Sequence, residues 1–207
     1  MKRLLAPLVA LTAGSMAILG SHPALAHNSA AGGALGGLSH PLLGLDHLFM
    51  LMAVGTAASF ISSELLLWAL GGAVIGAAMG FTGVSVASAE VMAALAISAV
   101  GALTLLAGRF AKTSNPNALT VCSGGVVAAG VAIHAMLHGL EAPKDSGTLL
   151  WWSGALLSSV LVCGGTYLVL KKLPVSVSKA AAVAFLAIGG FLALIGPLGP
   201  LAAGAGA

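Results

Sequence analysis

The chain has 207 residues, of which 59% are hydrophobic and only 6% are charged, and its mean hydropathy is +1.09. Soluble domains carry about 25% charged residues, so this composition excludes a water-soluble globular fold. The net charge of +3 at pH 7 comes without a basic patch, which argues against nucleic acid as a partner. The 29 glycines favour closely packed membrane helices, because small residues let helix backbones approach each other.

Residues 1–26 form the first predicted element, with the sequence MKRLLAPLVALTAGSMAILGSHPALA. A basic start, an apolar middle and Ala24-Leu25-Ala26 at the end are typical of a cleavable secretory signal peptide. We therefore expect cleavage after Ala26. The mature chain would then begin at His27, on the periplasmic side of a bacterial inner membrane.

Six apolar segments follow, each close to the roughly 20 residues that a membrane-spanning helix needs. The segments cover about residues 42–60, 65–84, 87–108, 117–138, 148–170 and 180–200. Their connections are short, which makes neighbouring helices antiparallel and leaves no room for a soluble domain. The sequence therefore predicts an all-α, polytopic membrane protein, in which residues 27–207 form one bundle of six transmembrane helices.

The distribution of basic residues indicates the same orientation as the signal peptide. If His27 lies outside, the loops after the third and fifth predicted spans face the cytoplasm. Those two loops carry most of the basic side chains of the mature chain: Arg109, Lys112, Lys171, Lys172 and Lys179. Cytoplasmic loops of membrane proteins are enriched in Lys and Arg, so the predicted topology satisfies the positive-inside rule.

Small residues follow a helical pattern in the second predicted span. Gly72, Gly76 and Gly80 repeat every four residues, which predicts a tight contact between two helices, either within the bundle or at the seam of a homo-oligomer. Cys122 and Cys163 lie in apolar runs without metal-ligand spacing, so we expect both to be small buried residues and not ligands.

Ligand-type side chains gather at the outer end of the predicted bundle. The runs HPLLGLDH at 40–47 and IHAMLHGLE at 133–141 both lie there, and so does Glu90 at the start of the third span. Within the second run, His134, His138 and Glu141 are spaced i, i+4 and i+7, which places them on one face of a helix. Pro41 and Gly44 make a regular helix at the first run doubtful, and broken helix ends commonly form ion sites in transporters.

Imidazoles and carboxylates together at a membrane face favour a divalent transition metal ion as the ligand. The candidate metal ligands are His40, Asp46, His47, His134 and His138, with His27, Glu90 and Glu141 as further ligands or as entry groups. Structural roles remain open for each of them, such as a satisfied histidine between helices or an acid in a first helical turn. A shared site requires the carboxylate of Asp46 to lie within about 10 Å of the imidazoles of the fourth span.

These motifs resemble the HupE/UreJ family of nickel/cobalt permeases over essentially the whole chain. The resemblance rests on His-Pro-x-x-Gly-x-Asp-His at 40–47 with Gly55 downstream, and on His-x-x-x-His-Gly-x-Glu at 134–141. Glu90 with Ser98 downstream, and a signal peptide that ends in Ala-His, are similar to the same family. Ala135 departs from the pattern, since the family often has glycine there, but this change leaves the ligand residues in place.

The resemblance implies a permease that carries Ni²⁺ or Co²⁺ from the periplasm to the cytoplasm for metalloenzymes or cobalamin synthesis. Its partners would be the metal ion and the lipid bilayer, and it would have no permanent cofactor and no catalytic activity. Two alternatives remain. An intramembrane metalloenzyme would need a placed base such as His-Glu-x-x-His, which the sequence lacks. A non-transporting subunit that delivers metal would be expected to have a larger loop or domain.

Overall fold

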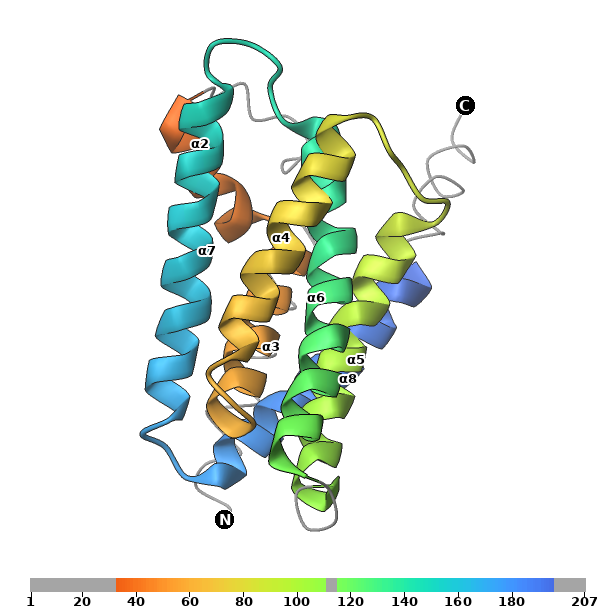
Figure 1. Ribbon diagram of the computed structural model, residues 1–207, viewed down its shortest axis with the longest axis vertical. Coiled ribbons are helices and arrows are strands. Elements are labelled where there is room, and N and C mark those ends of the chain that lie inside the picture. The colour runs from red at the N-terminus through yellow and green to blue at the C-terminus, as the bar shows by residue number, and fades with distance from the viewer. Residues whose placement is uncertain (1–32, 111–114, 196–207) are drawn as a thin grey trace. The chain divides into compact units, whose positions relative to one another are not determined.

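The computed structural model describes residues 33–110 and 115–195 (Figure 1). The predicted signal peptide and His27 lie outside these residues. Every regular element in the described part is a helix, so the all-α prediction is confirmed there. The helices are α2 (Gly33–Leu43), α3 (Leu45–Phe60), α4 (Leu65–Phe81), α5 (Ala89–Phe110), α6 (Pro116–Glu141), α7 (Thr148–Leu170) and α8 (Val175–Ile195).

Helix length and composition make this a multi-pass membrane protein. The helices α5, α6, α7 and α8 are each long and apolar enough to cross a membrane. The helices α2 and α3 form a pair bent by 75°, which makes a fifth candidate if the pair counts as one span. The helix α4 is apolar but has only 17 residues. The prediction of six spans is therefore supported for four segments, or for five with the bent pair.

Two differences from the predicted helices exceed three residues within the described part of the chain. The helix α2 was not expected, because its sequence GALGGLSHPLL is rich in glycine and contains Pro41. The helix α8 begins at Val175, inside a predicted loop and before the predicted start at residue 180. Pro174 precedes it, and the carbonyl oxygen of Pro174 accepts a hydrogen bond of 2.8 Å from the amide of Val177. A proline at the start of a helix is favourable, because its fixed φ matches the first turn.

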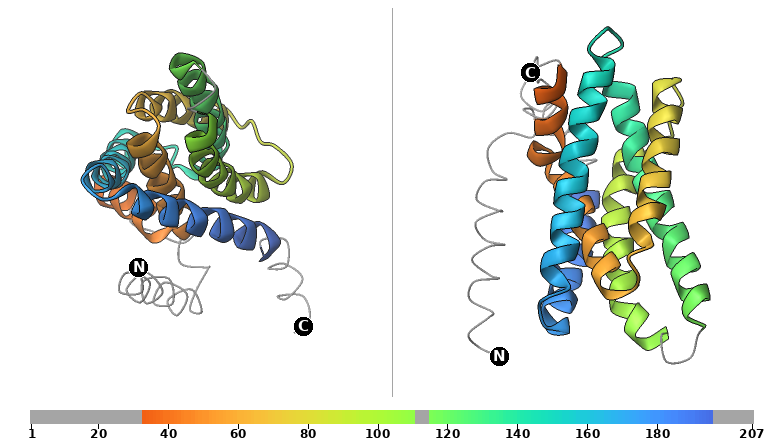
Figure 2. Two further views of the ribbon diagram at one scale, coloured as in Figure 1. Left: turned by 90° about the horizontal axis from the view of Figure 1, so that it is seen from below. Right: turned by 60° about the vertical axis from the view of Figure 1, so that its left-hand side comes forward.

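The helix α3 is the centre of the bundle and contacts all six of the other described helices. Its buried side chains, which include Met50, Val54 and Ala57, form the main apolar core together with Ile97 of α5 and Val127 of α6. The helices α4 and α6 run side by side around this centre, and so do α2 and α7 (Figure 2). Residues on α3 are therefore within reach of side chains from several helices.

The glycine stripe of α4 packs against α6 in the same chain. Gly72, Gly76 and Gly80 are all buried, and a Cβ on Gly76 would overlap the carbonyl oxygen of Ala132. A Cβ on either of the other two glycines would likewise overlap a backbone carbonyl oxygen of α6, one turn before or one turn after Ala132. The stripe is thus a helix-packing surface within the bundle and not an oligomer seam, and it holds α4 against the helix that carries His134.

Glycines also attach α2 to the first half of α7. A Cβ on Gly37 would overlap the carbonyl oxygen of Trp151, and a Cβ on Gly154 would overlap that of Ala34. Such close backbone approach needs residues without side chains at the contact. The contact fixes α2, and with it His40 in the last turn of α2, although α2 is short and contains a proline.

The outward-facing side chains of the bundle are mostly apolar. Leu149 is 82% exposed and Leu194 is 74% exposed, and many other large apolar residues are similarly open. A surface of this kind is stable against lipid and not against water. Cys122 belongs to this exposed surface, so the expectation that it is buried was wrong, whereas Cys163 is buried as expected.

Candidate metal site

The break between α2 and α3 brings two parts of the first motif together. Gly44 between the helices is extended, with φ −76° and ψ 109°, and its amide still donates to the carbonyl oxygen of His40. A Cβ on Gly44 would lie 2.8 Å from Nδ1 of His47, so any larger residue would displace that imidazole. The break leaves His40 on α2, and it places Asp46 and His47 in the first turn of α3.

The second motif lies on one face of α6, as its spacing predicts. The helix continues to Glu141, so His134 and His138 are one turn apart and both face α3. His134 is 6% exposed, and neither of its ring nitrogens has a hydrogen-bond partner. A buried polar group without a partner costs about 1–3 kcal/mol, and a bound cation would relieve this cost at one nitrogen.

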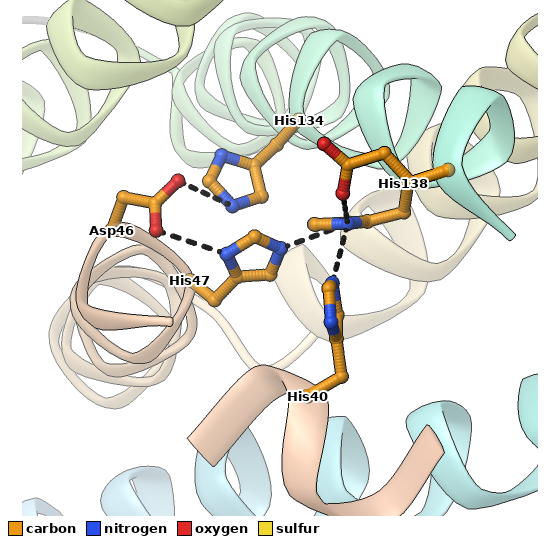
Figure 3. A network of polar contacts seen from close by, with 6 residues as sticks. His40, Asp46, His47, His134 and His138 are labelled. Carbon is orange, nitrogen blue, oxygen red and sulfur yellow. Dashed lines mark hydrogen bonds and ion pairs between the residues drawn. The ribbon is translucent and has the colours of Figure 1, made fainter. Parts of the chain in front are cut away.

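Five side chains lie close together and are called the cluster below: His40, Asp46, His47, His134 and His138 (Figure 3). Three of them are imidazoles from three different helices. Nε2 of His40 lies 2.8 Å from Nδ1 of His138, and Nε2 of His47 lies 3.2 Å from the same Nδ1. Metal–nitrogen bonds of about 2.0–2.1 Å place neighbouring ligand atoms roughly 2.9–3.4 Å apart, for angles between 90° and tetrahedral. Both separations are close to this range, and the ligand atoms of all three residues lie within 4.8 Å of one another, as ligands of one transition metal ion would.

Asp46 joins a second group of ligand atoms. Its Oδ1 lies 3.1 Å from Nδ1 of His47, and its Oδ2 lies 3.7 Å from Nε2 of His134. The separation from the α6 imidazoles is thus well inside the limit that the sequence analysis set. Within the described residues, Asp46, His47 and His134 form one group of ligand atoms that all lie within 4.8 Å, and His40, His47 and His138 form another.

The remaining candidates lie at the margin of the cluster or away from it. Oε2 of Glu141 is 3.9 Å from Nδ1 of His138, and Glu141 is exposed at the end of α6. Glu90 is exposed in the first turn of α5 and belongs to neither group of ligand atoms. The structure therefore places Glu141 beside the cluster, as an entry group would require, and gives Glu90 no contact with it.

The cluster borders an apolar cavity of about 370 Å³. All four histidines line it, whereas Asp46 does not, and the other lining side chains come mainly from α3, α4, α6 and α7. Trp151 also lines the cavity. Its ring centroid lies 5.2 Å from that of His40, and it is only 5% exposed. Sequence reasoning missed Trp151, because nothing in an apolar span marks one tryptophan as a neighbour of a distant histidine.

An apolar boundary strengthens the electrostatic interactions that the ligands make, because apolar side chains screen charges less than water does. The arrangement can thus replace the water shell of a small dication by imidazole nitrogens and one carboxylate. Neither cysteine belongs to a group of ligand atoms within the described residues, although Cys163 lines the cavity. The donor set is borderline nitrogen and oxygen without thiolate, which suits Ni²⁺, Co²⁺ or Zn²⁺ better than Cu⁺.

Comparison with known proteins agrees with these features. Residues 15–198 match the family described as HupE / UreJ protein, a range that contains both ligand motifs and all seven described helices. The chain is 30% identical over 148 residues to Protein HupE from Rhizobium leguminosarum bv. viciae, across 68% of this chain and 73% of that protein. No solved structure matches the chain. With its ligand motifs on a bundle of apolar helices, the chain belongs to the HupE/UreJ family.

Proposed function

We propose that the protein is a permease that imports Ni²⁺ or Co²⁺ from the periplasm into the cytoplasm across a bacterial inner membrane. The observation that carries this proposal is the convergence of His40, Asp46, His47, His134 and His138 from three helices. Membership in the HupE/UreJ family supports the choice of ion. No resident cofactor takes part, and the metal ion is the transported substrate.

The free-energy cost of polar side chains inside a membrane explains why the cluster is better assigned to ion transport than to helix packing. Ionisable residues within membrane helices are rare and mark ion pathways as a rule, because charged side chains are costly to place in lipid. His134 adds the cost of burial without hydrogen bonds. A bound dication would offset the cost of the charged side chain and the cost of the buried imidazole. Apolar side chains would fill the same space without these costs.

The proposed orientation follows from the signal peptide and the positive-inside rule. Cleavage after Ala26 would place the mature N-terminus in the periplasm, and six spans would follow, with the bent pair as the first and α4 as the second. The cluster would then face the periplasm. An ion would exchange its waters for the ligand side chains there and continue inward along the bundle.

Uptake of radioactive nickel by whole cells tests the proposal directly. Cells that express the chain should accumulate the label. If nickel and cobalt are both substrates, excess unlabelled cobalt should compete with labelled nickel more strongly than copper or zinc does. Accumulation without chemical change of any substrate separates transport from the metalloenzyme alternative. Absence of accumulation, together with metal binding to the purified protein, would favour the alternative of a metal-delivery subunit.

Replacing His138 by alanine is expected to abolish nickel uptake. Nδ1 of His138 lies within 3.2 Å of both His40 and His47, so its loss removes the nitrogen that the other two imidazoles face. Immunoblots of membranes should show the variant at the level of the parent. Uptake equal to that of the parent would exclude His138 from the ion pathway.

The cysteine variants Cys122→Ala and Cys163→Ala are expected to transport nickel as well as the parent does. Cys122 is exposed on α6, and Cys163 is a small buried residue that belongs to neither group of ligand atoms. The readout is the initial rate of uptake at a limiting nickel concentration. A rate more than about tenfold lower for Cys163→Ala would add a thiolate to the ligand set and change the expected metal preference.

A further inference from the structure

We propose that the cluster holds one metal ion at two alternative positions, one on each ring nitrogen of His47. When the ion changes position, the ring proton moves to the nitrogen that the ion leaves, because a neutral imidazole offers only one lone pair at a time. The proposal rests on the proposed function for the identity of the ion. The first position, the histidine position, uses His40, His138 and Nε2 of His47. The second, the aspartate position, uses Asp46, His134 and Nδ1 of His47.

The shared imidazole prevents all five side chains from binding one ion together. Nδ1 of His47 faces the carboxylate of Asp46, and Nε2 of the same ring faces His138 (Figure 3). The two ring nitrogens of an imidazole are distinct sites that point away from each other, so a single ion binds only one of them. The ligand atoms of the five residues accordingly fall into two groups with His47 in common.

The two positions differ in charge and in surroundings. The aspartate position includes a carboxylate whose side chain is 45% exposed, beside the buried imidazole of His134. The histidine position has three neutral imidazoles as ligands, and all three line the apolar cavity, which Asp46 does not. An accessible carboxylate attracts a hydrated dication, and an uncharged ligand set holds it less tightly. The two positions therefore hold the ion with different strengths, and His47 connects them.

Electrostatics limits the cluster to one ion at a time. Bonds of about 2 Å on each nitrogen would place two ions roughly 6 Å apart across the ring. Two dications at this distance repel strongly beside an apolar cavity, and Asp46 is the only carboxylate in either group within the described residues. The positions are therefore alternatives for one ion, and a second ion arriving at one position would displace the first from the other.

Metal binding to the full chain, purified in detergent and loaded with Co²⁺, tests the two positions separately. The double variant His40→Gln with His138→Gln leaves only the aspartate position. The double variant His134→Gln with Asp46→Asn leaves only the histidine position. We expect each to bind about one Co²⁺ per chain, with affinity within about 100-fold of the parent, because each keeps a complete group of three ligands.

X-ray absorption of the bound Co²⁺ identifies which ligands are used. The first double variant should show a carboxylate oxygen, and the second should show imidazole nitrogens without a protein carboxylate. The parent spectrum should be a weighted sum of the two. Adding His47→Ala to either double variant should abolish binding. If only one double variant binds Co²⁺, and its spectrum equals that of the parent, the ion has a single position and the proposal is wrong.

The parent provides a second test that does not depend on the folding of any variant. A ligand shell that contains all five side chains at once would overturn the proposal. Nickel uptake by cells is measured separately, so the two hypotheses fail independently. Two positions without uptake would refute transport alone, and uptake with a single ligand shell would refute the two positions alone.

Discussion

Replacing Asp46 by asparagine is expected to lower nickel uptake by more than about 100-fold, because it removes a ligand of the proposed ion pathway, and changes to residues outside the ligand shell already cost about 10–100-fold in activity. Asparagine keeps the shape of the side chain but loses the charge that faces both His47 and His134. The measurement is the initial rate of uptake by cells at a nickel concentration well below saturation. Membrane levels of the variant should equal those of the parent.

Glu64→Gln is the matched control for Asp46→Asn. It removes the same charge from an exposed acid that precedes α4 and belongs to neither group of ligand atoms. Uptake by this control should stay within about twofold of the parent, since a single exposed charge has little effect on a distant site. Full uptake by Asp46→Asn would remove the carboxylate from the pathway. The site would then consist of imidazoles alone.

Replacing Gly76 by alanine is expected to destabilise the protein by about 3 kcal/mol or more, at the upper end of the range for overpacking. The added Cβ would overlap the backbone carbonyl oxygen of Ala132, and backbone cannot move aside as a flexible side chain can. The helices α4 and α6 must separate. Because Ala132 is only two residues from His134, the change should also displace the ligands on α6 and lower uptake.

Thermal unfolding in detergent measures the effect of Gly76→Ala. A change of 1 kcal/mol shifts the melting temperature by about 2–4 °C in a protein of this size, so a decrease of roughly 6–12 °C is expected. Gly71→Ala is the matched control on the same helix, because nothing lies within 4 Å of the Cβ that it adds. Equal melting temperatures for the two variants would show that α4 and α6 do not pack as closely as described.

Much of the helical architecture could be predicted from the sequence. Backbone polar groups must be paired inside lipid, so a long apolar segment becomes a helix wherever it lies. The segment 148–170 coincides with α7, and 65–84 and 87–108 differ from α4 and α5 by three residues or fewer at either end. The small-residue spacing of α4 and the shared face of His134 and His138 were equally readable, because both depend only on the period of one helix.

Spatial relations between helices could not be predicted in the same way. The sequence suggested that the first span was irregular, but only the structure places the break at Gly44 and turns α2 by 75° onto α7. Likewise, the glycine stripe predicted a close contact without naming its partner. The exposure of Cys122 was missed for the same reason, because an apolar sequence does not tell which face of a helix meets lipid and which meets protein.

The amino-acid sequence by itself determined that this protein resides in lipid, where its helices run, and which scarce side chains are able to bind a metal ion. Only the tertiary structure decided that His40 and His47 meet His138 across 98 and 91 residues of chain, and that Asp46 lies beside His134. The physical reason is that helix formation depends on local backbone pairing and on the solvent. Contacts between helices depend instead on the rotation and bend of each helix, which its packing against several others sets.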